Sequence, residues 1–294
     1  MKKKRFRGIR VGEALIGYGF ILPYAIFFGV FMAYALVNGI WTSLQHKTFR
    51  TSYFCGLDNY IELFSDSTFI LSVLNTLGFV IIIVSLTFIF SIWISSTIFD
   101  KSIRYMSFVR AAYYIPNICS MVVMSVVWAC LLNTTSGVVP WLLRKMGFGT
   151  VNFLGDPNLA FGTVCVAVVF TNLGTAIVLY LAAMMGVSTE MLEAAEIDGA
   201  TRFQKIRYIL LPSVRGTTDY IFVTNVVAVL KIFAIIRLLT AGGPNYRTTT
   251  MMYYLYLNAF NYNEMGVASA CGVIMFIVAV VISIPRMKKM IQEM

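Results

Sequence analysis

The chain has 294 residues, of which 59% are hydrophobic and only 12% are charged. A soluble domain carries about 25% charged residues, so this composition excludes an ordinary soluble enzyme or binding module. The formal net charge of +10 suggests nucleic-acid binding as an alternative, but no basic run lies on a segment that resembles a soluble fold. We therefore expect a membrane protein that contacts lipid and binds no nucleic acid.

Long charge-free segments predict six membrane-spanning helices. Residues 14–46, 67–99, 111–143 and 157–189 contain no Asp, Glu, Lys or Arg, and a spanning helix needs only about 20 residues. The predicted spans are approximately 14–40, 69–99, 106–132, 158–185, 217–239 and 265–285, of which the fifth is interrupted by Lys231 and Arg237. We expect an all-α membrane protein that forms a single transmembrane domain over residues 1–294.

The basic residues predict the orientation. If the N-terminus is cytoplasmic, the cytoplasmic segments hold 16 Lys and Arg residues and the outer segments hold five. This positive-inside bias places both termini in the cytoplasm. The basic start, Lys2 to Arg5, resembles a signal peptide, but the apolar run after it is far longer than about 15 residues, so we expect an uncleaved anchor.

Three connecting segments have a recognisable character. Residues 41–66 carry Asp58, Glu62 and Asp66 among aromatic residues, which predicts a short interfacial helix. The connection between the third and fourth spans is the richest in Gly and Pro, which predicts turns. The five cysteines include no C-x-x-C pair and His46 is the only histidine, so we expect neither a disulfide framework nor a metal site.

The polar segment between the fourth and fifth spans, residues 188–212, predicts two short helices separated by a break. Ser188 is placed to cap the first helix, and Gly199 can adopt positive φ at the break. Thr201 and Gln204 have the spacing of a capping box that starts the second helix. Pro212 is expected to end regular hydrogen bonding.

Apolar residues on the first of these helices suggest a partner. They are Met191, Leu192, Ala194, Ala195 and Ile197. A short amphipathic helix of this kind can insert into a groove of another protein. It can equally lie on the lipid surface, and its periodicity fits both alternatives.

The spacing of residues 188–212 resembles the signature loop of the membrane subunits of bacterial ABC importers, and we call this segment the coupling loop after the role that the resemblance implies. The residues that carry the resemblance are Glu193, Ala194, Ala195, Gly199, Ile209, Leu211 and Pro212. Segments 17–23, 56–60, 230–233, 240–244 and 265–270 resemble the maltose and multiple-sugar (binding-protein-dependent, type I) permeases. The chain departs from that branch at Ala234, where an acidic residue is frequent, and at Tyr34 and Ala35, where a proline is frequent.

The resemblance implies a transport subunit rather than an enzyme. It implies that the loop docks on a separate ATPase subunit, with Glu193 making a charge contact and Gly199 forming the bend. Ala194 and Ala195 would be small because the groove of the partner is close. The chain contains no G-x-x-x-x-G-K-[ST] phosphate loop, so ATP and Mg²⁺ are expected on the ATPase and no cofactor on this chain.

The resemblance also implies further partners and a solute. A second, homologous permease subunit and an extracellular solute-binding protein are expected, in a bacterial cytoplasmic membrane. The solute is expected to be a carbohydrate, with an oligosaccharide favoured. A glycerol phosphodiester or polyol derivative is the alternative. A stand-alone secondary transporter is a distant third, because neither an inverted repeat nor an in-span carboxylate for proton coupling is evident.

Ionisable and polar residues inside spans are the candidates for the solute path. Lys231 is the first, because an ionisable residue in a span marks function by default. On a continuous helix it shares a face with Thr224, Ala228 and Ala234. Alternatively, its ammonium snorkels to the outer interface or packs against the second subunit. The further candidates are Asn172, Asn225 and Trp128, although polar residues in spans commonly bond to neighbouring helices.

Overall fold

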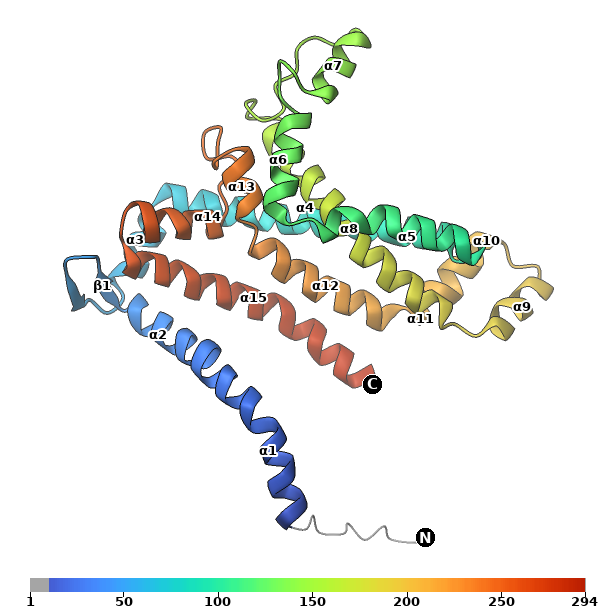
Figure 1. Cartoon of the computed structure of the whole chain (residues 1–294), viewed down its shortest axis with the longest axis horizontal. Coiled ribbons are helices and arrows are strands. Elements are labelled where there is room, and N and C mark those ends of the chain that lie inside the picture. Colours follow the sequence, from blue (N-terminus) through green and yellow to red (C-terminus); the bar gives the residue numbers. More distant parts are fainter. Residues whose placement is uncertain (1–10, 294) are drawn as a thin grey trace.

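The structure is a computed structural model that describes the backbone of residues 11–293 and the side chains of residues 18–288. The basic residues 2–5 therefore lie outside the described residues. The side chains of residues 1–17 and 289–294, which contribute to the predicted positive-inside bias, also lie outside them. The described chain is almost entirely helical (Figure 1).

The elements follow one another from the N-terminus as a series of long helices joined by short ones. The first part contains α1 (Val11–Phe27), the π-helical η1 (Phe28–Ala33), α2 (Tyr34–Ser43), β1 (Gln45–Lys47), β2 (Ser52–Phe54), α3 (Asp58–Ser65) and α4 (Ser67–Ile98). The middle contains α5 (Ile103–Ile118), α6 (Met121–Leu131), α7 (Val138–Lys145) and α8 (Ala160–Met185). The last part contains α9 (Thr189–Ile197), α10 (Arg202–Lys205), η2 (Ile206–Leu210), α11 (Leu211–Ser213), α12 (Arg215–Leu230), α13 (Ala234–Leu239), α14 (Met251–Tyr256), η3 (Leu257–Asn261) and α15 (Met265–Glu293).

Four helical stretches in the described chain are long and apolar enough to cross a membrane. They are Tyr18–Ser43, Ser67–Ile98, Ala160–Met185 and Met265–Lys288. They coincide with the first, second, fourth and sixth predicted spans. The count rises to five if α5 and α6 together form one span.

The third predicted span, 106–132, is not one continuous helix. The helix ends at Ile118, and α6 starts at Met121 after a bend of 98°. Ser120 adopts an extended backbone, and its hydroxyl accepts a hydrogen bond from the Val123 amide, so it caps a new helix. Pro116 lies one turn before the break, where it removes a hydrogen-bond donor from the last turn of α5.

The fifth predicted span, 217–239, is also interrupted. Helix α12 ends at Leu230, and residues 231–233 link it to α13. Lys231 therefore occupies a helix C-terminus instead of the middle of a helix. The expected common face with Ala234 does not form, whereas Thr224, Ala228 and Lys231 remain exposed along α12.

The core lies where α4 packs against α8, with α12 beside both. Phe79 of α4 stacks on Phe161 of α8 with ring centroids 4.1 Å apart. On another face of α8, Gly174 allows α5 to approach closely, since a Cβ at this position would lie 2.3 Å from the Tyr113 carbonyl oxygen. The contact between α5 and α8 therefore requires glycine at position 174.

The outer connections contain more structure than the sequence indicated. The expected short helix is α3, but β1 and β2 also form an antiparallel hairpin in which His46 pairs with Tyr53. Helices α7 and α14 were not predicted. In α14, the hydroxyl of Tyr254 lies 2.7 Å from a carboxylate oxygen of Asp66. Burial and this hydrogen bond raise the pKa of Tyr254, so the phenol keeps its proton and its O–H donates the hydrogen bond to Asp66.

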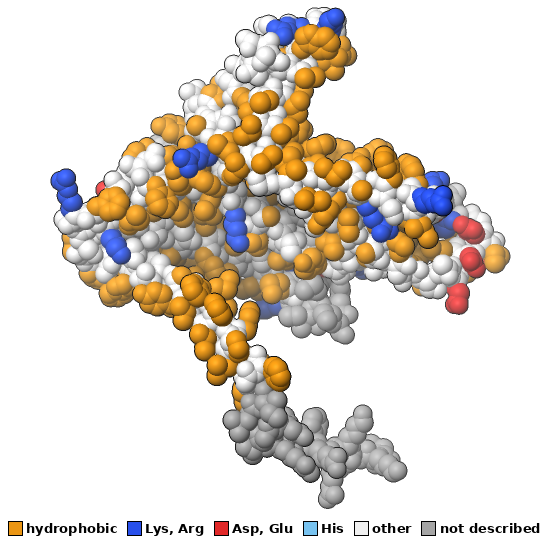
Figure 2. Space-filling model, in the orientation of Figure 1, with side chains coloured by type: hydrophobic (Ala, Val, Ile, Leu, Met, Phe, Trp, Pro, Cys, Tyr) orange, Lys and Arg blue, Asp and Glu red, His pale blue; other side chains and the backbone are white. Residues whose placement is uncertain are grey.

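The first long helix lies apart from most of the bundle. Only its α2 end packs beside α15, and α1 extends away from the other helices (Figure 1). None of the most apolar window in Tyr18–Ser43 is buried within the chain. Its hydrophobic side chains are exposed along its length (Figure 2). This helix therefore needs lipid or another protein around it.

Candidate functional site

The coupling loop forms one end of the molecule, where α9 and α10 project beyond α8 and α12 (Figure 1). Gly199 has a φ of +75°, as the sequence predicts. The amide of Ala200 donates to the Ala195 carbonyl at 2.9 Å, and the amide of Gly199 donates to the Glu196 carbonyl at 3.0 Å. These two bonds form a Schellman motif, which ends α9 and turns the chain toward α10.

Of the other local predictions for the coupling loop, the capping box is confirmed, whereas those for Ser188 and Pro212 are not. Thr201 and Gln204 form the predicted capping box. Ser188 occupies the N-cap position of α9, yet its side chain makes no capping hydrogen bond, contrary to expectation. Pro212 does not end the helical path either, because the wider π-helical turn η2 leads into α11 and accommodates the missing N–H group.

The loop is firmly attached to the membrane helices. Leu210 and Val214 are fully buried in a cluster with Tyr180 of α8 and Ile221 of α12. Arg202 reaches the end of α4, where its Nη2 donates to the carbonyls of residues 96 and 97 and pairs with a carboxylate at position 100, at distances of 2.8–3.2 Å. These contacts connect the loop to α4, α8 and α12.

The exposed surface of the coupling loop carries both apolar and acidic side chains. Ile197 is 87% exposed, Phe203 68% and Tyr208 69%. The three glutamates of α9 form the acidic region at this end of the molecule (Figure 2). Asp198, Gly199, Tyr208 and neighbouring residues also line a shallow cavity of about 280 Å³. Exposed large apolar residues on a polar loop are typical of an interaction surface.

The signature residues divide between this surface and the interior. Glu193, Ala194, Gly199 and Pro212 are exposed, whereas Ala195, Ile209 and Leu211 are half-buried. The exposed members are available to a partner. The half-buried members pack the loop against its own helices.

Three of the five candidates for the solute path lie together. Asn172 of α8 and Thr224 and Asn225 of α12 line one cavity of about 130 Å³ between the two helices. Each asparagine donates one N–H to the carbonyl four residues earlier, at 2.9 Å. An amide group has two acceptor sites and a second N–H, so these side chains retain hydrogen-bonding capacity for a hydroxyl-rich solute.

The other two candidates lie elsewhere. Lys231 is exposed and lines a larger, mainly apolar cavity of about 520 Å³ between α12 and α15. Trp128 packs edge-on against Phe170 with ring centroids 5.8 Å apart, and its buried Nε1 has no hydrogen-bond partner among the described residues. The structure therefore does not bring Lys231 or Trp128 into the small polar cavity.

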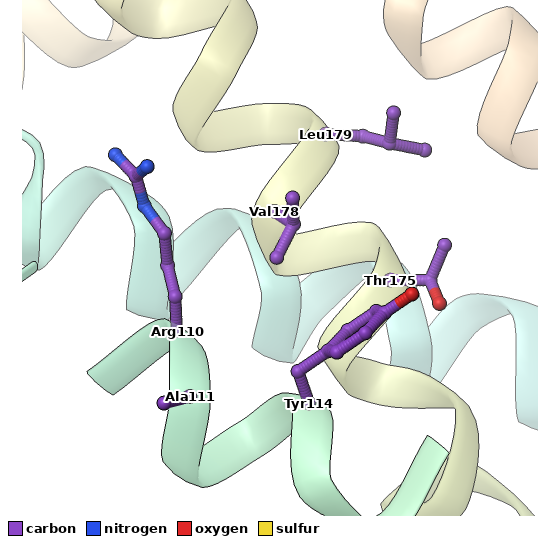
Figure 3. Close-up of a pocket in the computed structure, with 6 residues that line it drawn as sticks. All are labelled: Arg110, Ala111, Tyr114, Thr175, Val178 and Leu179. Carbon is purple, nitrogen blue, oxygen red and sulfur yellow. The ribbon is translucent and has the colours of Figure 1, made fainter. Parts of the chain in front are cut away.

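Sequence reasoning missed a neighbouring cavity of about 450 Å³ between α5 and α8 (Figure 3). Arg110 and Tyr114 line it from α5, and Thr175 and Leu179 line it from α8. Arg110 was counted only as a cytoplasmic basic residue, because charge patterning cannot show that a side chain turns toward another helix.

One carboxylate lies within residues 217–239, the fifth predicted span. The side chain of Asp219, near the start of α12, is only 7% exposed and lies 3.0 Å from Nη1 of Arg286 on α15. This ion pair joins α12 to α15. This carboxylate has a structural role, because an arginine holds it in place. Asp219 lies near the edge of the predicted span, so the sequence did not single it out.

Residues 67–286 match the family described as binding-protein-dependent transport system inner membrane component. The chain belongs to this family. It is therefore a multi-pass membrane permease subunit, a transport component and not an enzyme.

Individual relatives agree with this assignment. The chain is 29% identical over 282 residues to the trehalose/maltose transport system permease protein MalF of Thermococcus litoralis, covering 95% of each chain. Among solved structures, it resembles a bacterial transporter that imports the acidic polysaccharide alginate, with 25% identity, a TM-score of 0.82 and coverage of 96% and 97%. The complex of the alginate transporter with a periplasmic protein that carries an alginate pentasaccharide gives a TM-score of 0.84, 25% identity and 94% coverage of both chains.

Proposed function

We propose that this permease subunit imports a carbohydrate, with an oligosaccharide favoured, which an extracellular binding protein delivers. The observation that carries the proposal is the polar cavity formed by Asn172, Thr224 and Asn225. Amide and hydroxyl groups match the hydrogen-bonding pattern of a sugar. The relatives that handle maltose, trehalose and alginate support the same solute class.

The proposed topology has six crossings in a single domain over residues 1–294, with both termini in the cytoplasm. It treats α5 with α6, and α12 with α13, as two broken crossings. The excess of Lys and Arg in the cytoplasmic segments supports this orientation. Broken helices are tolerated at membrane depth where they are covered by protein or line a cavity.

The coupling loop is proposed to dock on an ATPase subunit. Its exposed apolar and acidic side chains supply a contact surface, and its buried anchors connect that surface to α4, α8 and α12. ATP and Mg²⁺ would bind to the ATPase. Closure of two such ATPases would move the loop and reorient the helices around the solute.

A second, homologous permease subunit would complete the path. The polar cavity is small and opens at the surface of this chain, so one chain supplies only part of an enclosed path. The exposed helix Tyr18–Ser43 offers a long apolar surface against which a second subunit can pack. The periplasmic protein bound to the alginate transporter supports the expectation of a binding protein on the outer side.

Uptake by the assembled transporter tests the proposed function. Proteoliposomes containing both permeases and the ATPases receive binding protein and labelled maltotriose or glycerophosphocholine, with Asn172→Leu and Asn225→Leu compared with Asn158→Leu. Each path variant is expected to lower uptake about tenfold, because it loses hydrogen bonds worth about 1–1.5 kcal/mol to the solute. Asn158 is exposed in the outer loop, so its variant is expected to match wild type.

Several outcomes would contradict parts of this proposal. Uptake of the phosphodiester but of no saccharide would replace the carbohydrate as the solute. Uptake that persists without the ATPase subunits would indicate a stand-alone transporter. Unchanged uptake in both asparagine variants would remove the polar cavity from the path.

A further inference from the structure

The positive charge of Arg110 has no anionic partner in the described chain. Its Nη2 contacts the sulfur of Met185 at 2.9 Å, and its Nε is buried without a hydrogen-bond acceptor. A thioether is only a weak acceptor. By contrast, Arg202 and Arg286 each form an ion pair with an aspartate at 3.0 Å.

The Arg110 side chain is only partly buried, so its outer N–H groups remain accessible to a ligand from outside the chain. An unpaired arginine on a membrane helix commonly faces a cavity or a partner. Arg110 lines the 450 Å³ cavity, and its side chain extends upward from α5, while Tyr114, Thr175 and Leu179 lie farther to the right (Figure 3). The cavity is therefore the place where a compensating anion can bind.

This cavity adjoins the proposed solute site. Thr175 and Leu179 line both the Arg110 cavity and the smaller cavity that contains Asn172. The hydroxyl groups of Tyr114 and Thr175 lie on the same side of the crossing between α5 and α8 (Figure 3). A solute that contacts the asparagine can extend along α8 to the guanidinium.

The charged side chains that line the Arg110 cavity and the cavity beside Lys231 are basic. No Asp or Glu lines the Arg110 cavity, the polar cavity or the cavity beside Lys231. The only ionisable acid on α8, α12 or the described part of α5 is Asp219, which Arg286 already neutralises. An anion would therefore meet attraction and no compensating repulsion along this face.

We propose that Arg110 binds a negatively charged group of the solute, so that the imported carbohydrate is an acidic one. This inference rests on the proposed carbohydrate function and specifies its substrate class. A carboxylate or a phosphate ester matches the planar guanidinium fork, which binds such groups through paired charge-assisted hydrogen bonds. The Thr175 hydroxyl and the Asn172 amide then bind the neutral hydroxyl groups of the same solute.

An anionic phospholipid is the competing occupant, because its headgroup carries the same phosphate chemistry. The shared lining residues favour the solute. Thr175 and Leu179 connect Arg110 directly to a polar cavity, and polar amides and hydroxyls offer little to an acyl chain.

Uptake of a matched pair of saccharides tests the inference. The complete transporter is reconstituted, and its binding protein is added at saturation and already loaded with labelled trigalacturonate or maltotriose. The permease variants are Arg110→Gln, which removes the charge, and Arg110→Lys, which keeps it. Arg104→Gln is the matched control, since Arg104 is an exposed arginine on the same helix and lines none of these cavities.

The expected result is a wild-type preference for trigalacturonate that falls at least tenfold in Arg110→Gln. Arg110→Lys is expected to keep most of the preference, and Arg104→Gln all of it. Co-purified ATPase shows that each variant assembles. If Arg110→Gln fails to assemble, a preference retained in Arg110→Lys and lost in Arg110→Met supplies the same comparison.

Three results separate the possible failures. A transporter that carries maltotriose with an unchanged ratio in Arg110→Gln would retain the proposed function and overturn the inference. A transporter that carries neither saccharide would overturn the proposed function itself. An equal loss of both saccharides in Arg110→Gln, seen only in vesicles containing phosphatidylglycerol, would assign Arg110 to a lipid and overturn the inference.

Discussion

Replacement of Gly199 gives the sharpest test of the coupling loop. Its φ of +75° is required by the Schellman motif that ends α9. A Cβ at this position would meet no atom within 4 Å in this chain. Gly199→Ala therefore introduces backbone strain without a clash inside the subunit.

The expected cost follows from that strain. A non-glycine residue in the left-handed region costs roughly 1–2 kcal/mol, and asparagine is tolerated better than alanine or valine. A change of this size lowers the ratio of native to non-native loop conformations by roughly 5- to 30-fold. The expected order of coupling activity is Gly, then Asn, then Ala, then Val.

The assay is ATP hydrolysis and solute uptake by the reconstituted transporter, with ATPase co-purification as the measure of docking. Gly216→Ala is the control, since Gly216 also has open space around its missing Cβ but no positive φ. Gly199→Ala is expected to lower stimulated hydrolysis by about 5- to 30-fold while Gly216→Ala leaves it unchanged. An order that follows side-chain volume, with Ala best and Asn worse, would refute the backbone argument and assign the requirement to close contact with the ATPase.

Two further predictions concern the contacts between the long helices. Gly174→Ala is expected to destabilise the chain by about 1–3 kcal/mol, because its Cβ would overlap the backbone of α5. Gly162→Ala on the same helix is the control, since its Cβ would enter open space. Thermal unfolding in detergent compares the two variants, and equal unfolding midpoints would contradict the packing. Asp219→Asn is expected to cost about 1.5–3 kcal/mol through loss of the charged hydrogen bond to Arg286, with Lys288→Gln as the exposed control. The same measurement applies, and an unfolding midpoint within error of the control would show that the ion pair does not join α12 to α15.

Local sequence signals succeeded where neighbouring residues alone fix the conformation. The capping box at Thr201 and the positive φ at Gly199 depend on hydrogen bonds between residues a few positions apart. The π-helical turn before Pro212 could not be predicted in this way. Its buried anchor, Leu210, packs against α8 and α12, so tertiary packing keeps the chain helical past the proline.

The broken helices show the same division. Hydropathy located the apolar segments but could not distinguish a continuous span from one that bends by 98° at Ser120. Lys231 was placed on a helical wheel that the break after Leu230 makes inapplicable.

The sequence by itself determined that this chain is a membrane protein, because apolar length depends only on composition along the chain. Its interpretation as a permease subunit came from the resemblance of its motifs to a known family. The sequence also predicted the helix break at Gly199 and the capping box at Thr201, which depend on residues close together in the sequence. Only the tertiary structure placed Asn172 beside Asn225 and placed Arg110 at the edge of a cavity, since these contacts depend on how α5 and α12 cross α8. Crossing geometry is set by close packing, as at Gly174, and that packing involves residues distant in the sequence.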